Sequence, residues 1–123
     1  MRNPPRILIA DDNAMNLDIL QKRLAVHGYE MLEAVTGEEG VALAARERPD
    51  LILMDIQLPG LDGYEATRRI KGNTGLRQIP IIAVTSYALS GDDAKALAAG
   101  CDAYVTKPFS PRALLAKIRE YLP

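Results

Sequence analysis

Short apolar runs alternate with longer segments of helical spacing along the whole 123-residue chain, and this alternation restricts the possible folds most strongly. We expect the apolar runs to be strands, at residues 6–10, 29–34, 51–55, 80–85 and 103–106. Strands that alternate with helices form a parallel sheet with helices on both faces. Right-handed crossovers leave few topologies, and we expect a doubly wound, three-layer (βα)5 α/β sandwich with strand order 2-1-3-4-5.

The segments between the apolar runs carry helix start and stop signals. Leu17, Leu20 and Leu24 are spaced i, i+3 and i+7 on one helical face, and Gly28 is a C-terminal cap. A capping box of Thr36 and Glu39 opens a helix over residues 36–48. Three further helices are predicted at about 62–71, at 90–100 and from Ser110, where Ser110 is an N-cap followed by Pro111.

The composition excludes several classes of protein. The chain has 15 basic and 16 acidic residues, a balance that does not favour a basic surface for nucleic acid. One cysteine, Cys101, and one histidine, His27, give no support for a disulfide, a histidine metal cluster or a Ser-His-Asp triad. The sequence contains neither a secretory signal nor a membrane-spanning run, so we expect a cytoplasmic protein with no membrane contact. We expect residues 1–123 to be one domain without an output domain.

Polar side chains stand at the ends of four of the five predicted strands. In open α/β sheets, ligands bind beyond the carboxyl ends of the strands. The expected strand order makes these four strands contiguous, so their polar ends should converge on one pocket. The residues are Asp11 and Asp12 after the first strand, Asp55 at the third, Thr85 at the fourth and Lys107 after the fifth.

Three crowded carboxylates repel one another and favour a divalent cation that takes oxygen ligands. Mg²⁺ is such a cation, and it prefers one or two carboxylates together with water and phosphate oxygens. Lys107 can hold a phosphate oxygen, and a carboxylate can act as a nucleophile that forms an aspartyl phosphate. Taken alone, each group has an ordinary explanation as a turn, cap or surface residue. Their joint placement at neighbouring strand ends favours a phosphoryl-acceptor site centred on Asp55.

The chain resembles the receiver domain of two-component response regulators, of the stand-alone chemotaxis-regulator type, over essentially its whole length. The resemblance implies a flavodoxin-like fold. It rests on four segments: ILIADDN at 7–13, LILMDIQLPGLDG at 51–63, IIAVTS at 81–86 and AYVTKPF at 103–109.

The resemblance implies a role for each matching residue. Asp11 and Asp12 match the metal-binding acidic pair, and Asp55 matches the phosphoacceptor and a further Mg²⁺ ligand. The backbone carbonyl of Gln57 matches the remaining protein ligand of Mg²⁺. Lys107 matches the lysine that binds the phosphoryl group.

The resemblance also implies a switch and residues that tune it. Thr85 matches the hydroxyl that turns toward the phosphoryl group, and Tyr104 matches the aromatic residue that then moves inward. The peptide bond between Lys107 and Pro108 matches one that the family usually holds in cis. Ser86 and Tyr87 match positions that affect phosphoryl lifetime. We expect Tyr87→Ala to accelerate dephosphorylation, and an unchanged rate would contradict this role.

The partners implied by the resemblance are a sensor histidine kinase or histidine phosphotransfer protein as donor, and a downstream protein as target. The donor is expected to dock on the first helix, around Ala14, Met15 and Leu17, with Leu17 in the core and Met15 exposed. The surface of the fourth helix, fifth strand and fifth helix is expected to change partners, and homodimerisation is left open. The protein is therefore expected to be a phosphoacceptor signalling protein and not an enzyme.

Two alternative classes fit the residues less well. A phosphatase that forms an aspartyl phosphate usually carries a general acid two residues after its nucleophile, where this chain has Gln57. A flavodoxin-like cofactor carrier would need a glycine-rich phosphate loop after its first strand. This chain instead has Asp11 and Asp12 there, which would repel a flavin phosphate.

Overall fold

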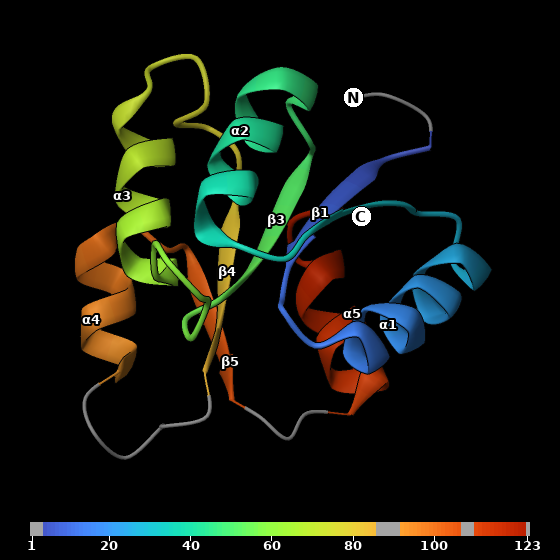
Figure 1. The fold of residues 1–123 in the computed structure, drawn as a ribbon. Helices are drawn as coiled ribbons and strands as arrows, with labels where there is room; N and C mark the ends of the chain where they lie inside the picture. The colour runs from blue at the N-terminus through green and yellow to red at the C-terminus, as the bar shows by residue number, and fades with distance from the viewer. Residues whose placement is uncertain (1–3, 86–91, 107–109, 123) are drawn as a thin grey trace.

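The protein folds into a five-stranded parallel sheet between two layers of helices (Figure 1). The computed structural model describes residues 4–85, 92–106 and 110–122. The sheet order is β2-β1-β3-β4-β5, as the sequence predicts. The strands are β1 (Arg6–Ala10), β2 (Glu30–Ala34), β3 (Leu51–Asp55), β4 (Ile81–Thr85) and β5 (Ala103–Thr106). The helices are α1 (Ala14–Val26), α2 (Gly37–Glu47), α3 (Gly63–Gly72), α4 (Asp92–Ala99) and α5 (Pro111–Arg119).

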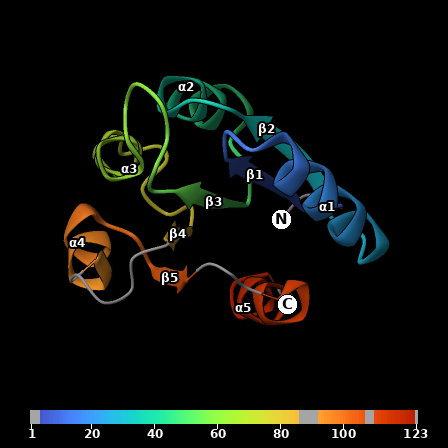
Figure 2. The ribbon, with the colours of Figure 1, turned by 60° about the horizontal axis from the view of Figure 1, so that its bottom comes forward.

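The two helical layers cover separate apolar cores, one on each face of the sheet. Figure 2 shows α1 and α5 on one face and α2, α3 and α4 on the other. Alternate residues of each central strand point to opposite faces, so both faces of β1, β3 and β4 must be apolar. Thus Ile7 and Ile9 join the core under α1 and α5, while Leu8 and Ala10 join the other. No helix in the described part of the chain is both long and apolar enough to cross a membrane.

The helix caps confirm several start and stop signals. The Thr36 hydroxyl accepts a hydrogen bond from the Glu39 N–H at 3.1 Å, and the Ser110 hydroxyl caps α5 in the same way. Gly28 follows α1 with φ of +84°, a conformation that glycine adopts without strain. Arg48 ends α2 with φ of +47°, which the sequence did not reveal. Ser90, predicted to open the fourth helix, lies outside the described residues.

The first residues of two predicted strands lie outside the sheet ladder. Tyr29 instead donates its N–H to the carbonyl of Leu24, which completes the end of α1. Pro80 has no N–H to donate, although its carbonyl accepts the Ile52 N–H at 2.9 Å. β2 and β4 therefore each begin one residue later than the apolar pattern indicates.

The single cysteine and the single histidine lie in different surroundings. Cys101 is buried, and its thiol lies 3.7 Å from the Thr67 hydroxyl. Burial raises the pKa of the Cys101 thiol, so the neutral form predominates at physiological pH. His27 is exposed at the end of α1.

Candidate functional site

The register between β1 and β3 brings Asp11 and Asp55 to the same edge of the sheet. Ala10 pairs with Met54, and the residues that follow them in the sequence are Asp11 and Asp55. Both follow the alternation that points toward the face covered by α1 and α5, and both are only 5% exposed. Two strands separated by 40 residues of sequence thus place two buried carboxylates side by side.

Asp12 completes a group of three carboxylates at this edge. One carboxylate oxygen from each of Asp11, Asp12 and Asp55 lies within 4.8 Å of the other two. Oxygen ligands on opposite sides of one Mg²⁺ are about 4 Å apart, so this spacing is close to that of a single coordination sphere. Asp12 is exposed, whereas the other two are buried. The group therefore has an open side that water or a phosphate oxygen can reach.

Hydrogen bonds hold the two buried carboxylates in position. The Asn13 N–H donates to Oδ1 of Asp11 at 2.8 Å, and the Asn16 side-chain amide donates to Oδ2 at 3.4 Å. The Gln57 N–H donates to Oδ1 of Asp55 at 3.0 Å. These donors fix the orientation of the two carboxylates at the edge of the sheet.

Asn13 and Asn16 are site residues that the sequence interpretation missed. Asn13 is the N-cap of α1, and its side-chain oxygen accepts the Asn16 N–H at 3.1 Å. The helix cap and the orientation of Asp11 thus depend on the same two asparagines. An asparagine directly after an acidic pair is a typical N-cap signal, which could have identified this link.

Thr85 lies on β4, which is next to β3 in the sheet, and Tyr104 lies on β5, which is next to β4. Thr85 ends β4 one residue after Val84, the partner of Asp55, and it is buried. Tyr104 pairs with Ala83, so alternation puts its side chain on the same sheet face as that of Thr85. Tyr104 is 38% exposed. The predicted switch pair is therefore a buried hydroxyl and an outward aromatic ring on adjacent strands.

Several predicted site residues lie outside the described part of the chain. These are Ser86, Tyr87, Lys107 and Pro108, together with the predicted cis bond between the last two. Gln57 is described, and its backbone contacts Asp55 through the N–H discussed above.

The segment between β3 and α3 passes very close to the backbone of Asp55. The Gly63 N–H donates to the Ile56 carbonyl at 3.0 Å. A Cβ atom at Gly63 would overlap the carbonyl oxygen of Asp55 and the Cα of Ile56. The start of α3 can therefore return to the end of β3 only with a glycine at this position, a requirement that the sequence interpretation missed.

The exposed surface of α1 carries an apolar side chain near each end of the helix. Met15 is 72% exposed and Val26, at the far end of the helix, is 81% exposed. Leu17 is buried in the core, and Ala14 is exposed. The predictions that Met15 is exposed and that Leu17 is a core residue are both confirmed.

The sequence matches the family model described as the response regulator receiver domain over residues 7–119. It is 41% identical over 119 residues to the polar-differentiation response regulator DivK of Brucella anthropi, covering 97% of each chain. DivK of Brucella ovis is 40% identical over 116 residues, covering 94% of each chain.

The fold is similar to those of solved receiver structures. The receiver domain of sensor histidine kinase PA1611 from Pseudomonas aeruginosa, solved with a magnesium ion coordinated in its active-site cleft, has a TM-score of 0.89 and 39% identity. That match covers 96% of this chain and 97% of the other. The chemotaxis response regulator CheY4 of Vibrio cholerae has a TM-score of 0.90 and 26% identity, covering 95% and 98%. The chain belongs to the response regulator receiver domain family.

Proposed function

We propose that Asp55 accepts a phosphoryl group from the phosphohistidine of a sensor histidine kinase or a histidine phosphotransfer protein in the cytoplasm. The observation that carries this proposal is the group formed by Asp11, Asp12 and Asp55, whose carboxylate oxygens lie within 4.8 Å of one another. In the transfer, a carboxylate oxygen of Asp55 attacks phosphorus. The phosphorus–nitrogen bond breaks, and its electron pair stays on the imidazole.

The residues around Asp55 fit a magnesium ion. The ligands would be the carboxylates of Asp11, Asp12 and Asp55 and the backbone carbonyl of Gln57, an oxygen-only set of the kind that Mg²⁺ prefers. Bound Mg²⁺ neutralises negative charge on the phosphoryl oxygens, the main requirement in phosphoryl transfer. Support also comes from the PA1611 receiver, which coordinates magnesium in its cleft. We assign to Lys107 the role of holding a phosphoryl oxygen through the positive charge of its ammonium group.

We propose that phosphorylation changes the surface formed by α4, β5 and α5. The Thr85 hydroxyl would turn toward the phosphoryl group, and the Tyr104 ring would move from its exposed position into the vacated space. A covalent ligand shifts such an equilibrium by its different contacts with the two states. Leu97 on α4 is 56% exposed and offers apolar area to a protein target. Ser86 and Tyr87 are assigned to tuning the phosphoryl lifetime.

The acceptor reaction is tested by incubating the purified chain with acetyl phosphate and Mg²⁺. We expect intact-mass spectrometry to show the addition of one phosphoryl group, labile to hydroxylamine as an acyl phosphate is. Chelation of Mg²⁺ with EDTA before the donor is added should prevent the addition. A phosphoryl group that forms equally well in EDTA, or that resists hydroxylamine, would contradict the proposed chemistry.

The phosphohistidine partner is proposed to dock on α1 around Met15, and the variant Met15→Glu tests this. We expect phosphotransfer from a cognate phosphohistidine protein to slow at least about tenfold, because a buried unpaired carboxylate at an interface costs more than about 1.4 kcal/mol. The rate with acetyl phosphate should stay unchanged, since a small donor needs no docking surface. The measurement is a time course of radiolabel transfer.

Val26→Glu provides the matched control, because it adds the same charge to an exposed apolar position of the same helix. It lies 11 residues further on, about 16 Å along the axis at ~1.5 Å per residue. We expect it to change transfer less than twofold. Equal slowing by both variants would indicate a general charge effect and not a docking site at Met15.

A further inference from the structure

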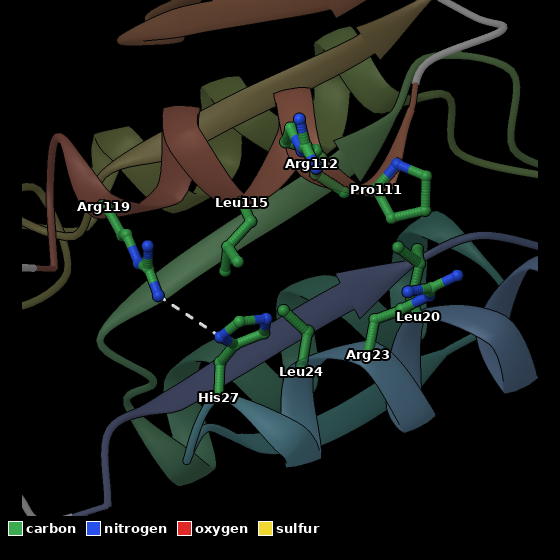
Figure 3. A pocket seen from close by; sticks show the side chains of 9 residues that line it. Leu20, Arg23, Leu24, His27, Pro111, Arg112, Leu115 and Arg119 are labelled. Carbon is green, nitrogen blue, oxygen red and sulfur yellow. Dashed lines mark hydrogen bonds between the residues drawn. The ribbon is translucent and has the colours of Figure 1, made fainter.

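A cleft of about 360 Å³ lies between α1 and α5, lined by residues from both helices. Its volume falls within the range of about 300–1,000 Å³ typical of small-molecule sites. Figure 3 shows residues of α1 and α5 facing each other across it. The lining residues are Leu20, Arg23 and Leu24 from α1, His27 at the C-cap of α1, and Pro111, Arg112, Leu114, Leu115 and Arg119 from α5.

The floor of the cleft is apolar. Leu20, Leu24 and Leu114 are buried and belong to the core on this side of the sheet. Leu115 is half-buried and extends from α5 toward α1 (Figure 3). A ligand with an apolar body would remove this leucine surface from water, a favourable transfer in proportion to the area covered.

The rim of the cleft is cationic. Arg23, Arg112 and Arg119 are all exposed, and no acidic residue is among those that line the cleft. In the part of the chain that the structure describes, none of the three arginines forms an ion pair. Nη2 of Arg119 instead donates to Nδ1 of His27 across the cleft at 3.2 Å (Figure 3).

We propose that this cleft binds an organic phosphate, that is, a phosphate group attached to an apolar body. A guanidinium group offers a planar fork of donors that matches phosphate oxygens in a bidentate manner. Arg112 and Arg119 are seven residues apart, about 10 Å along α5, and Leu115 lies between them. A phosphate at either end of the cleft thus meets arginine, while the attached body lies on leucine. Nucleotides and phospholipids share this chemistry.

The proposal is tested by NMR titration of the full ¹⁵N-labelled chain with four probes. Adenosine monophosphate and dihexanoyl phosphatidic acid represent the two sources, and inorganic phosphate and adenosine represent the separate parts of a ligand. We expect at least one organic phosphate to shift the amides of Arg23, His27 and Arg119. It should bind at least tenfold more tightly than inorganic phosphate and adenosine. Which of the two binds more tightly identifies the source.

Charge-removing variants test whether the rim is responsible. We expect the double variant Arg23→Gln and Arg119→Gln to weaken binding at least tenfold, and its exposed positions leave the core intact. Arg69→Gln, an exposed arginine on α3 outside the cleft, is the matched control and should change binding less than twofold. The variant Asp55→Asn should bind the organic phosphate as tightly as the unchanged chain does. Binding in the cleft would therefore be observed even if Asp55 were not the phosphoacceptor.

Four outcomes would overturn the proposal. The first is no amide shift with millimolar organic phosphate, and the second is inorganic phosphate bound as tightly as the organic probes. The third is tighter binding of an acidic amphipathic peptide of Glu and Leu, which would indicate a protein ligand. The fourth is self-association, seen by sedimentation and abolished by the double arginine variant, which would assign the cleft to a second copy of the chain.

Discussion

Replacing Asp55 by asparagine is expected to leave no phosphoryl group on the protein after incubation with acetyl phosphate and Mg²⁺. The reaction requires a carboxylate oxygen as nucleophile, and a neutral amide does not supply one. Asp11 and Asp12 remain in the variant but are assigned to the cation and not to phosphorus. Intact-mass spectrometry after different incubation times measures the result. A label that persists on Asp55→Asn would contradict the assignment of the acceptor.

The loss must reflect chemistry and not unfolding. Asparagine keeps the size of the side chain and an oxygen that can accept the Gln57 N–H. Removing one of three crowded negative charges relieves a repulsion on the order of 1–3 kcal/mol, which offsets attractions lost with the charge. We therefore expect the free energy of unfolding in urea to change by less than about 1 kcal/mol. Asp18→Asn removes the same charge from the exposed face of α1 and should leave labelling unchanged.

Gly63→Ala is expected to destabilise the protein by at least about 2 kcal/mol and to reduce labelling at Asp55. The new methyl group would overlap the backbone of Asp55 and Ile56, which cannot move aside as a flexible side chain does. Overpacking costs about 1–3 kcal/mol or more, whereas the helix propensity of alanine returns less than about 1 kcal/mol. The steric effect therefore dominates. Urea unfolding gives the stability change, and acetyl phosphate labelling gives the effect on the site.

Gly72→Ala is the matched control for this prediction. It makes the same substitution in the same helix, but a Cβ atom there would have no neighbour within 4 Å. We expect its free energy of unfolding to stay equal or to rise by less than about 1 kcal/mol. If the two variants had equal stability, the close approach of α3 to the end of β3 would not explain the requirement for glycine.

The two-sided core was predictable because it depends on local patterns, and the strand order was predictable because right-handed crossovers leave few topologies. Ile7–Ala10 and Ile81–Val84 are continuously apolar, as strands covered on both faces are, and the helix caps are short-range signals. The first residue of β2 was predicted one position early because Tyr29 completes the end of α1. Apolar character alone does not distinguish a residue of the sheet ladder from one that closes a helix.

The sequence by itself determined that acidic residues end neighbouring strands, because each strand end is marked locally by a change from apolar to polar residues. The expected strand order already placed Asp11 and Asp55 at one edge of the sheet. Only the tertiary structure decided the register that buries both, since strand register is set by packing between distant segments. The same holds for Gly63, whose importance comes from a backbone contact with Asp55. It also holds for the cleft, which is lined by Arg23 of α1 and Arg119 of α5, two helices that are far apart in the chain. Such contacts leave no periodic or short-range trace, and therefore only the folded chain reveals them.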